Sequence, residues 1–564
     1  MKRLALRALA MGLIGLAACN NDVGPRHLST SAAGGAGGQP PGMDGGGSGG
    51  IPIGPTTPSA SAVRARCAQS KVAPPMLRRL TRSEIDNSIF DLFPQIASSY
   101  SGVKLGPDPL SSLKFTNDAS VLLVGDETAK EILKMAKEVA ALVAGPTLLP
   151  SILPCATGSA DQVCATTFID TFGPRIYRHA LSDEERTELV GYYASVAGRS
   201  TFAMGLKWTL IAMLQSPDFL YRSEIGDASG KLTPDEIATE LSYTFGGTTP
   251  SAALAMKAAS GALGSPDALV QEALALQQTP RGHQVLESFF REWTGYEKVV
   301  GTTKMAAPNF DVVEGSMVQE TQKFIDEVVF NAGGNVKDLL TARYTFVDAA
   351  LAPFYGFGVP GAAGGFAKAD RPANWGIGLL AQGSILAGTS HPAQTSPVFR
   401  GLLVYANLLC NTRPKPPPIV PTIDSAPAAN TTRERFENLH AQASCMPCHQ
   451  QFEPFGYAFE FFDETGRYRA NENGFAIDAA ATALLPEGTK LTFNGLDDLA
   501  TQLAAMPAVT DCVSGLLSTY AFAGGGGQLC LAEEARSALA SGTYGLRDFY
   551  AQLARAPSFT QRVR

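Results

Sequence analysis

Residues 233–245 read TPDEIATELSYTF, and they carry the helix-start signals that decide the fold class of this chain. The first four residues are a capping box, in which the first and fourth side chains satisfy backbone amides, with proline at the first helical position. Ile237, Leu241 and Phe245 then follow at helical spacing, so that one face can pack inward. The stretch therefore predicts an amphipathic helix.

The same signals recur along the chain. Capping boxes at residues 81–84 and 182–185 each precede apolar residues at helical spacing. Further helices are predicted at about residues 126–144, 163–178, 201–215, 280–294, 311–330, 376–388, 398–409, 432–446, 508–522 and 544–555. Strand patterns are few, the best being a small hairpin between Ala476 and Phe493. The predicted fold class is mainly α, a multi-module helical protein with little β.

The N-terminus has the pattern of a bacterial lipoprotein signal. Three basic residues precede an apolar run over residues 8–18, which ends in Leu-Ala-Ala directly before Cys19. This run is too short to span a bilayer, and no later apolar stretch reaches that length. We therefore expect a signal peptide over residues 1–18, a lipid on Cys19, and attachment to the bacterial cell envelope on its periplasmic or surface face.

Residues 19–62 are rich in Gly, Ser and Pro and predict a tether. The remaining chain is expected to divide into helical modules. An N-terminal one covers residues 63–148, a second covers 149–205 and a central one covers 206–373, and they are followed by a CxxCH module at 374–470 and a C-terminal helical module at 471–564.

The charge of the chain argues against nucleic acid as a partner. The formal net charge is −7, and removal of the three basic signal residues would leave about −10. The sequence contains no basic block. Partners are therefore expected among exported redox or surface proteins, with the membrane reached through the lipid.

The residues Cys445-Met446-Pro447-Cys448-His449 form a CxxCH motif in this exported context. Its two thiols can each add to a haem vinyl group, and the adjacent histidine is then the proximal iron ligand. The motif predicts covalent haem c on Cys445, Cys448 and His449. The alternative is a reduced or disulfide-bonded CxxC beside an unrelated histidine.

The sixth position of such an iron needs Met, His, Lys or no protein ligand. Met506 is followed by proline, as is the ligand methionine of small cytochromes c, and it is the first candidate. His391 and His440 are alternatives, although we expect His440 to be a surface residue on a helix that continues toward the motif. Open or water-bound iron competes with all three.

Six other cysteines follow the lipidation site in an oxidising compartment. The pairs Cys155–Cys164 and Cys512–Cys530 are close in sequence, and pairing within each would leave Cys67 with Cys410. Other connectivities stay open, because cysteine spacing alone does not fix them.

The sequence has no HExxH, Walker A or Rossmann glycine phrase. Residues 46–50, GGSGG, match the GxSxG pattern of serine hydrolases only formally, because they lie in the low-complexity tether with no strand before them or helix after them. The carboxylates of Glu460 and Asp463 lie three positions apart. We expect them to cap or to pair with Arg467 and Arg469 rather than to bind a metal.

Residues 445–469, CMPCHQQFEPFGYAFEFFDETGRYR, resemble the CxxCH-x-x-x-D-P-x-G-x-x-x-E-x-F-D-x-x-G-x-x-R signature of large exported planctomycete and myxobacterial proteins. RRLTRSE at residues 78–84 and LQSPDFLYR at 214–222 are similar to other phrases of that family. These proteins contain tandem domains of unknown function of the 1587, 1595, 1592, 1588 and 1585 types, and the resemblance covers about residues 75–564. It implies an exported, cytochrome-c-like protein; Glu453 stands where the family has aspartate.

Together these patterns predict an exported, lipid-anchored c-type haem protein that transfers electrons to or from a redox partner. One alternative is a cell-surface lipoprotein that binds a polysaccharide or a protein and in which CxxCH is structural. A second is a haem-dependent oxidative enzyme, which would need an accessible sixth position.

Overall fold

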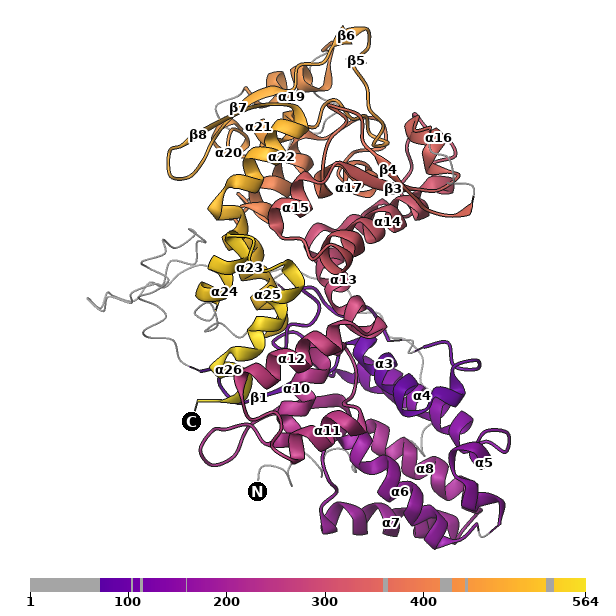
Figure 1. Ribbon diagram of the computed structural model, residues 1–564. Helices are drawn as coiled ribbons and strands as arrows, with labels where there is room; N and C mark the ends of the chain where they lie inside the picture. Colours follow the sequence, from indigo (N-terminus) through magenta and orange to yellow (C-terminus); the bar gives the residue numbers. More distant parts are fainter. Residues whose placement is uncertain are drawn as a thin grey trace, which may run out of the picture. The chain divides into compact units, whose positions relative to one another are not determined.

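The computed structural model describes residues 72–102, 105–111, 115–158, 160–358, 364–415, 429–441, 445–523 and 532–563 (Figure 1). The expected signal peptide, Cys19 and the tether lie outside these residues, as do Cys67 and Cys530. The prediction of a mainly α protein is confirmed, since the strands form only two-stranded sheets among many helices. None of the described helices is both long enough and apolar enough to cross a bilayer.

The first part of the described chain packs around one apolar core that includes Phe168, Ile211 and Phe219. Capping boxes begin α3 after Thr81 and α7 after Ser182, as the sequence predicts. The elements are β1 (Met76–Arg79), α3 (Arg82–Leu92), α4 (Asp126–Val143), α5 (Leu149–Ile152), α6 (Gln162–Tyr177), α7 (Asp183–Ala197), α8 (Phe202–Gln215), α9 (Pro217–Leu220) and β2 (Tyr221–Glu224).

A larger apolar core contains Phe115 together with residues from Leu232 to Phe559. Its helix α10 begins at the predicted capping box, with Thr233 accepting from the Glu236 amide. The elements from here to residue 388 are α10 (Pro234–Gly246), α11 (Ala252–Ala259), α12 (Pro266–Gln277), α13 (Pro280–Thr294), α14 (Asp311–Asp326), a π-helical turn (Glu327–Asn331), α15 (Val336–Thr341), β3 (Tyr344–Val347), α16 (Leu351–Tyr355), β4 (Ala367–Asp370) and α17 (Gly383–Gly388).

The rest of the chain returns to this same core. Its elements are α18 (Pro397–Leu402), a π-helical segment (Leu403–Leu408), α19 (Thr432–His440), α20 (Met446–His449), α21 (Glu453–Tyr457), β5 (Asn471–Glu472), β6 (Phe475–Ala476), β7 (Ala480–Leu484), β8 (Lys490–Asn494), α22 (Gly495–Ala505), α23 (Pro507–Ala521), α24 (Ala532–Ala540), α25 (Leu546–Gln552) and α26 (Pro557–Thr560). The predicted hairpin is β7–β8, with Ala480 opposite Asn494.

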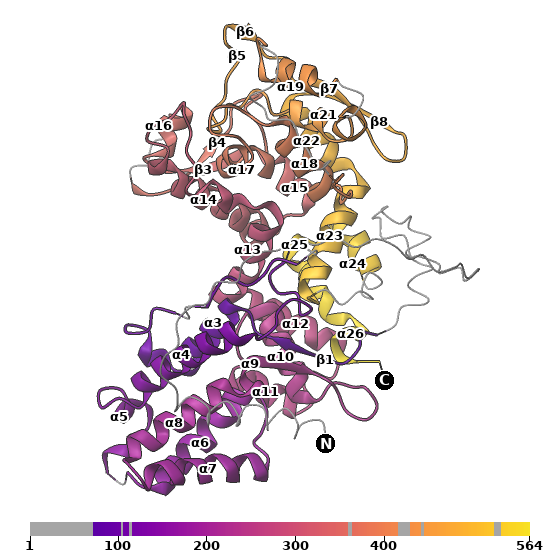
Figure 2. The same ribbon diagram turned by 180° about the vertical axis from the view of Figure 1, so that it is seen from behind.

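Segments far apart in sequence meet at the β1–β2 pair, where Met76 lies opposite Glu224 and Arg79 opposite Tyr221. The Leu232 amide donates to the Thr560 carbonyl at 2.8 Å, so that α26 closes onto the same region. Figures 1 and 2 show indigo β1 beside yellow α26 in both views. The start, middle and end of the described chain are thus held together by direct contacts.

Two predicted helices are shorter in the structure. In the 376–388 stretch, Gly376 and Gly378 have positive φ of 75° and 65°, which an α-helix does not contain, and Gln382 is extended, so that α17 begins at Gly383. In the 432–446 stretch, α19 ends at His440. Both differences are at helix ends, where sequence patterns are least precise.

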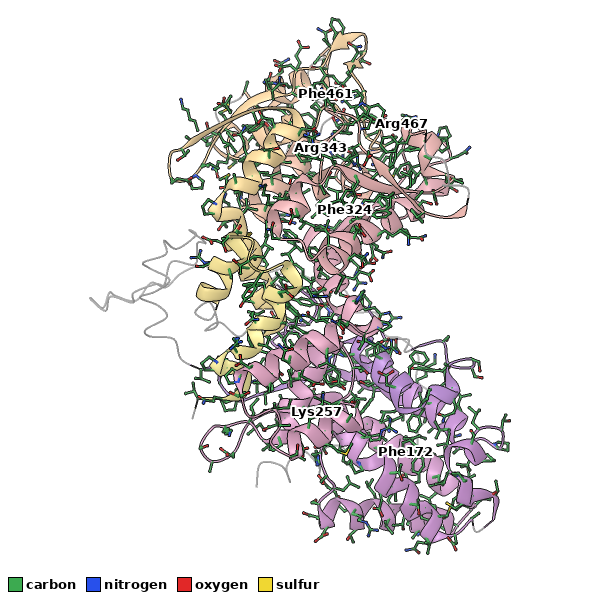
Figure 3. The ribbon with its side chains drawn as sticks, viewed as in Figure 1. Phe172, Lys257, Phe324, Arg343, Phe461 and Arg467 are labelled. Atoms are coloured by element: carbon green, nitrogen blue, oxygen red, sulfur yellow. A yellow bond between two sulfur atoms is a disulfide. The ribbon has the colours of Figure 1, made fainter. Side chains whose placement is uncertain are left out.

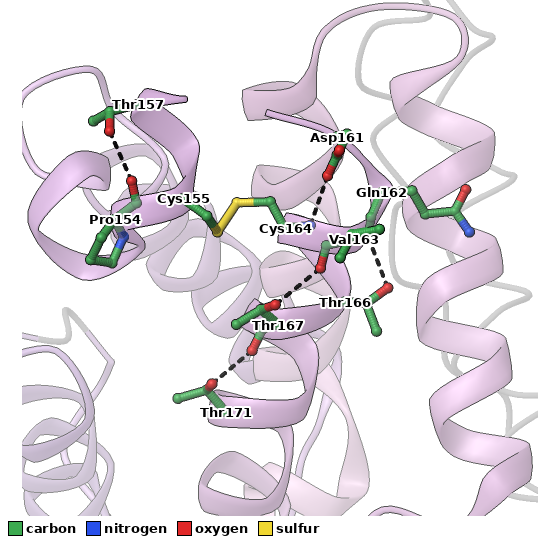
Figure 4. The surroundings of a disulfide bond; sticks show 10 residues. All are labelled: Pro154, Cys155, Thr157, Asp161, Gln162, Val163, Cys164, Thr166, Thr167 and Thr171. Atoms are coloured by element: carbon green, nitrogen blue, oxygen red, sulfur yellow. Dashed lines mark hydrogen bonds between the residues drawn. A yellow bond between two sulfur atoms is a disulfide. The ribbon is translucent and has the colours of Figure 1, made fainter. Parts of the chain in front are cut away.

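The predicted Cys155–Cys164 disulfide is confirmed, with a Cα–Cα distance of 5.7 Å (Figure 4). Cys155 lies in a short 3₁₀ turn and Cys164 in the first turn of α6, where the Asp161 side chain caps the Cys164 amide at 2.9 Å. The bridge therefore ties the start of α6 to the turn that precedes it.

The predicted pairs Cys512–Cys530 and Cys67–Cys410 are wrong, because Cys410 is bonded to Cys512. Cys410 follows the π-helical segment, and Cys512 lies on α23, which packs against that segment. Tertiary packing, not closeness in sequence, therefore selects the partner of Cys512.

The Cys410–Cys512 bridge is expected to be the more stabilising of the two disulfides. It closes a separation of 102 residues against 9 for Cys155–Cys164. The chain-entropy model gives about 4.7 kcal/mol for the long loop and about 2.6 kcal/mol for the short one. Urea unfolding of the two double Cys→Ser variants measures this difference, and a larger loss from the short bridge would contradict the expectation.

Candidate functional site

The CxxCH motif lies on α20 and on the residue before it. Cys445 is the N-terminal cap of α20, and His449 is the last residue of this short helix. Cys445 and Cys448 are half-buried thiols. The motif is thus a compact helical turn in which both cysteines come before the histidine that ends the helix.

A buried carboxylate holds the histidine of the motif. His449 Nδ1 lies 2.9 Å from Glu453 Oε1, and Glu453 is only 4% exposed. The other Glu453 oxygen accepts from the Tyr457 hydroxyl at 3.4 Å, and burial followed by the Glu453 charge raises the pKa of Tyr457. A carboxylate accepts from Nδ1–H, so this contact leaves the lone pair of His449 on Nε2.

His440 lies against His449, which makes the expectation of a surface histidine wrong. The two rings stack with centroids 3.6 Å apart, and the His440 side chain is only 13% exposed. His440 Nδ1 is 2.5 Å from the same oxygen of Glu453. The reason is that α19 ends at His440, so the two histidines are not confined to different faces of one helix.

The cluster His440–His449–Glu453 is therefore a set of possible metal donors. One ligand atom from each residue lies within 4.8 Å of the other two. Imidazole nitrogen together with carboxylate oxygen suits iron and zinc. A metal bound to this cluster would be held by His440, His449 and Glu453, which would supply two imidazole nitrogens and one carboxylate oxygen.

The segment after the motif is anchored by Arg400, which is fully buried on α18. Its guanidinium donates to three backbone carbonyls of the segment, those of Phe459, Phe462 and Asp463, and to the Leu386 carbonyl of α17, all at 2.9–3.2 Å. Burial lowers the pKa of Arg400 to about 10, with Glu460 opposing the shift. One buried cation therefore fixes the backbone that follows α21.

The carboxylates of Glu460 and Asp463 pair with arginines, as predicted. Arg469 contacts Glu460 at 3.1 Å, and Arg467 contacts Asp463 at 3.3 Å. The Arg467 guanidinium also lies over the Phe354 ring at 5.2 Å, and Figure 3 labels Arg467 in this region. These carboxylates are structural.

Met506 and His391 lie in other surroundings. Met506 is half-buried at the junction of α22 and α23, where it packs against the large core. The His391 ring contacts Phe399 at 5.1 Å, and burial followed by the nearby Lys304 charge lowers its pKa. Of the candidate sixth ligands, His440 is the one that the structure sets beside His449.

Sequence reasoning missed Glu453 as a partner of His449 and His440 as a neighbour. The four-residue spacing of His449 and Glu453 was the available signal, since residues four apart face each other on a helical turn. The approach of His440 had no comparable local signal, because it depends on the path of the chain after α19.

Comparison with known families gives four matches in tandem. Each matching family model is described as a protein of unknown function. The models are PSD3 (DUF1587) at residues 78–145, PSD5 (DUF1595) at 164–224, PSD4 (DUF1592) at 232–357 and PSCyt3 (DUF1588) at 377–472. The last range contains the CxxCH motif. No curated protein and no solved structure matches the chain. The chain belongs to the proteins built from these tandem DUF1587, DUF1595, DUF1592 and DUF1588 domains.

Proposed function

We propose that this protein is an exported, lipid-anchored c-type haem protein that transfers electrons to or from a redox partner. The observation that carries the proposal is the contact between His449 Nδ1 and Glu453, which prepares Nε2 of a CxxCH histidine for a metal. Ligand histidines in metalloproteins usually donate their other N–H to a carboxylate or carbonyl in this way.

The chemistry of the donor set fits haem. Cys445 and Cys448 offer two thiols for the vinyl groups, and His449 offers Nε2 for the iron. Haem supplies a one-electron couple when it is bound. The protein orients His449 through Glu453 and holds the following backbone through Arg400, which limits rearrangement around the site.

A second candidate is a non-haem divalent metal site, and the close approach of the His440, His449 and Glu453 donor atoms favours it. Two imidazoles and one carboxylate are a common zinc donor set. In this function the CxxC thiols would be further donors or structural residues. The two candidates differ in colour and in metal content.

The deciding experiment is a visible spectrum with pyridine haemochrome and in-gel haem staining. The full chain is produced with cytochrome c maturation machinery, beside a Cys448→Ser variant as the control. A c-type spectrum in the wild type that changes to a single-thioether type or is lost in the variant supports the proposal. The charge-transfer band of Met–His ligation in the ferric form would support Met506 as the sixth ligand.

Metal analysis completes the test. Folded, colourless protein with one zinc per chain, lost in a His449→Ala variant, would replace haem by the second candidate. Colourless protein without metal would contradict both and would favour a binding lipoprotein with a structural CxxCH.

A further inference from the structure

A second set of metal-donor side chains lies outside the CxxCH segment, where α6, α7 and α9 come together. His179 follows the end of α6, Glu185 lies in the first turn of α7, and Asp218 lies on α9. One donor atom from each of these residues lies within 4.8 Å of the other two. The fold thus brings one imidazole and two carboxylates into one place from three helices.

The backbone around this donor set is held by buried polar contacts. The guanidinium of Arg178 is buried and donates to the Asp218 carbonyl and to two carbonyls that follow it, at 2.6–2.9 Å. Glu185 closes the capping box of α7, in which its carboxylate accepts from the Ser182 amide at 2.8 Å. These contacts fix α9 and the start of α7 beside the residue that follows Arg178.

The His179 ring is oriented by a backbone carbonyl. Its Nδ1 lies 2.9 Å from the Ala180 carbonyl oxygen and 3.9 Å from Glu185 Oε2. A carbonyl oxygen only accepts, so Nδ1 carries the hydrogen and Nε2 carries the lone pair. Histidines that bind metals commonly donate their other N–H to a carbonyl in this way.

The surroundings of the donor set are rich in negative charge. Asp235 lies beside it, where burial raises the pKa of this carboxyl and the charge of His179 opposes the shift. Neither Asp218 nor Asp235 forms an ion pair with a lysine or arginine among the described residues. Three carboxylates therefore surround one imidazole, and a divalent cation would balance two of their charges.

A cavity of about 430 Å³ borders His179 and Asp235. Zinc sites with three protein ligands keep a water or a substrate atom in the fourth position. The cavity gives solvent and small solutes a route to that position. A site with three protein donors and an open side is thus consistent with the space around His179.

We propose that His179, Glu185 and Asp218 bind one divalent transition-metal ion, for which Zn²⁺ is the best fit. Imidazole together with carboxylate suits Zn²⁺, whereas Ca²⁺ and Mg²⁺ take oxygen ligands. Ligand atoms of a tetrahedral zinc lie about 3.3–3.6 Å apart, so the ion draws these donors together by about 1 Å. The site shares no residue with the CxxCH segment, and its failure would leave the proposed haem function untouched.

The test is calorimetric titration of the metal-free full chain with ZnCl₂. The parent for all titrations carries Cys445→Ser, Cys448→Ser and His449→Ala, so that the CxxCH motif supplies no donor. One Zn²⁺ per chain is expected to bind, and Glu185→Gln is expected to lower the affinity at least about tenfold. Glutamine also closes a capping box, so the melting temperature of the metal-free variant should stay nearly unchanged.

Glu84→Gln is the matched control, because Glu84 closes the capping box of α3 and lies outside the donor set. It should bind Zn²⁺ as tightly as the parent. Equal affinity of Glu185→Gln and the parent, or absence of Zn²⁺ binding by the parent, would overturn the proposal.

Two further measurements identify the donors. Co²⁺ in place of Zn²⁺ should give a visible absorption spectrum that changes or disappears in His179→Ala, because the imidazole is one of its ligands. Ca²⁺ should bind more weakly than Zn²⁺. An unchanged Co²⁺ spectrum in His179→Ala, or Ca²⁺ binding as tight as that of Zn²⁺, would show that these residues do not form a transition-metal site.

Discussion

Replacement of Arg400 by methionine is expected to destabilise the protein by about 3–5 kcal/mol, because it breaks a buried charge network. Methionine has a similar length but no donor. Four carbonyls that Arg400 now satisfies, together with the Ser390 hydroxyl at 3.0 Å, would lose this partner. Glu460 would keep Arg469 and lose its second cation.

The loss should appear as a lower midpoint in urea unfolding and as faster proteolysis within residues 453–469, since Arg400 holds this backbone. Arg467→Met is the matched control: its side chain is 36% exposed and its pair with Asp463 is partly solvated, so its loss should stay below about 1 kcal/mol. Equal stability of the two variants would show that Arg400 is not the anchor.

The helices could be predicted where local signals are strong. Helix α13 begins at Pro280 and ends at Thr294, as predicted, because proline favours the first helical turn and Gly295 takes the left-handed conformation that ends the helix. The capping boxes mark the starts of α3, α7 and α10 for an equally local reason. Such signals act within a few residues, so they predict helix ends without knowledge of the tertiary fold.

Contacts between distant segments could not be predicted in the same way. The β1–β2 pair joins residues about 145 positions apart, and neither short strand has an alternating apolar pattern that specifies its partner. Cys410–Cys512 depends on the packing of α23 against the π-helical segment. The role of Arg400 depends on carbonyls some 60 positions later, which become its acceptors only when α18 and α21 pack together.

In the candidate site, too, the residues that are adjacent in sequence could be predicted and the contacts between distant residues could not. The CxxCH motif identifies Cys445, Cys448 and His449 from sequence alone, because this chemistry needs adjacent residues. From sequence, Glu453 is noted only as a residue that stands where the family has aspartate, whereas in the structure its carboxylate is the buried partner of His449. His440 reaches the cluster only through the course of the chain beyond α19.

Replacement of Glu453 by glutamine is expected to raise the reduction potential of the proposed haem while leaving its covalent attachment intact. An ionised acceptor on His449 Nδ1 makes the imidazole a stronger donor and stabilises ferric iron. Glutamine keeps an acceptor oxygen but removes the charge. The difference between a charged and a neutral hydrogen bond, about 1–2 kcal/mol, corresponds to about 40–90 mV for one electron.

The measurement is spectroelectrochemical titration of wild type and Glu453→Gln, with pyridine haemochrome to confirm equal haem content. Glu437→Gln is the matched control, because Glu437 is half exposed on α19 and pairs with Arg433 rather than with a histidine. A potential that rises only in Glu453→Gln would show that the buried carboxylate tunes the iron through His449. An unchanged potential with full haem content would mean that Glu453 only packs against His449. If the wild type itself contained no haem, the proposed function would be contradicted, and the role of Glu453 would not be what failed.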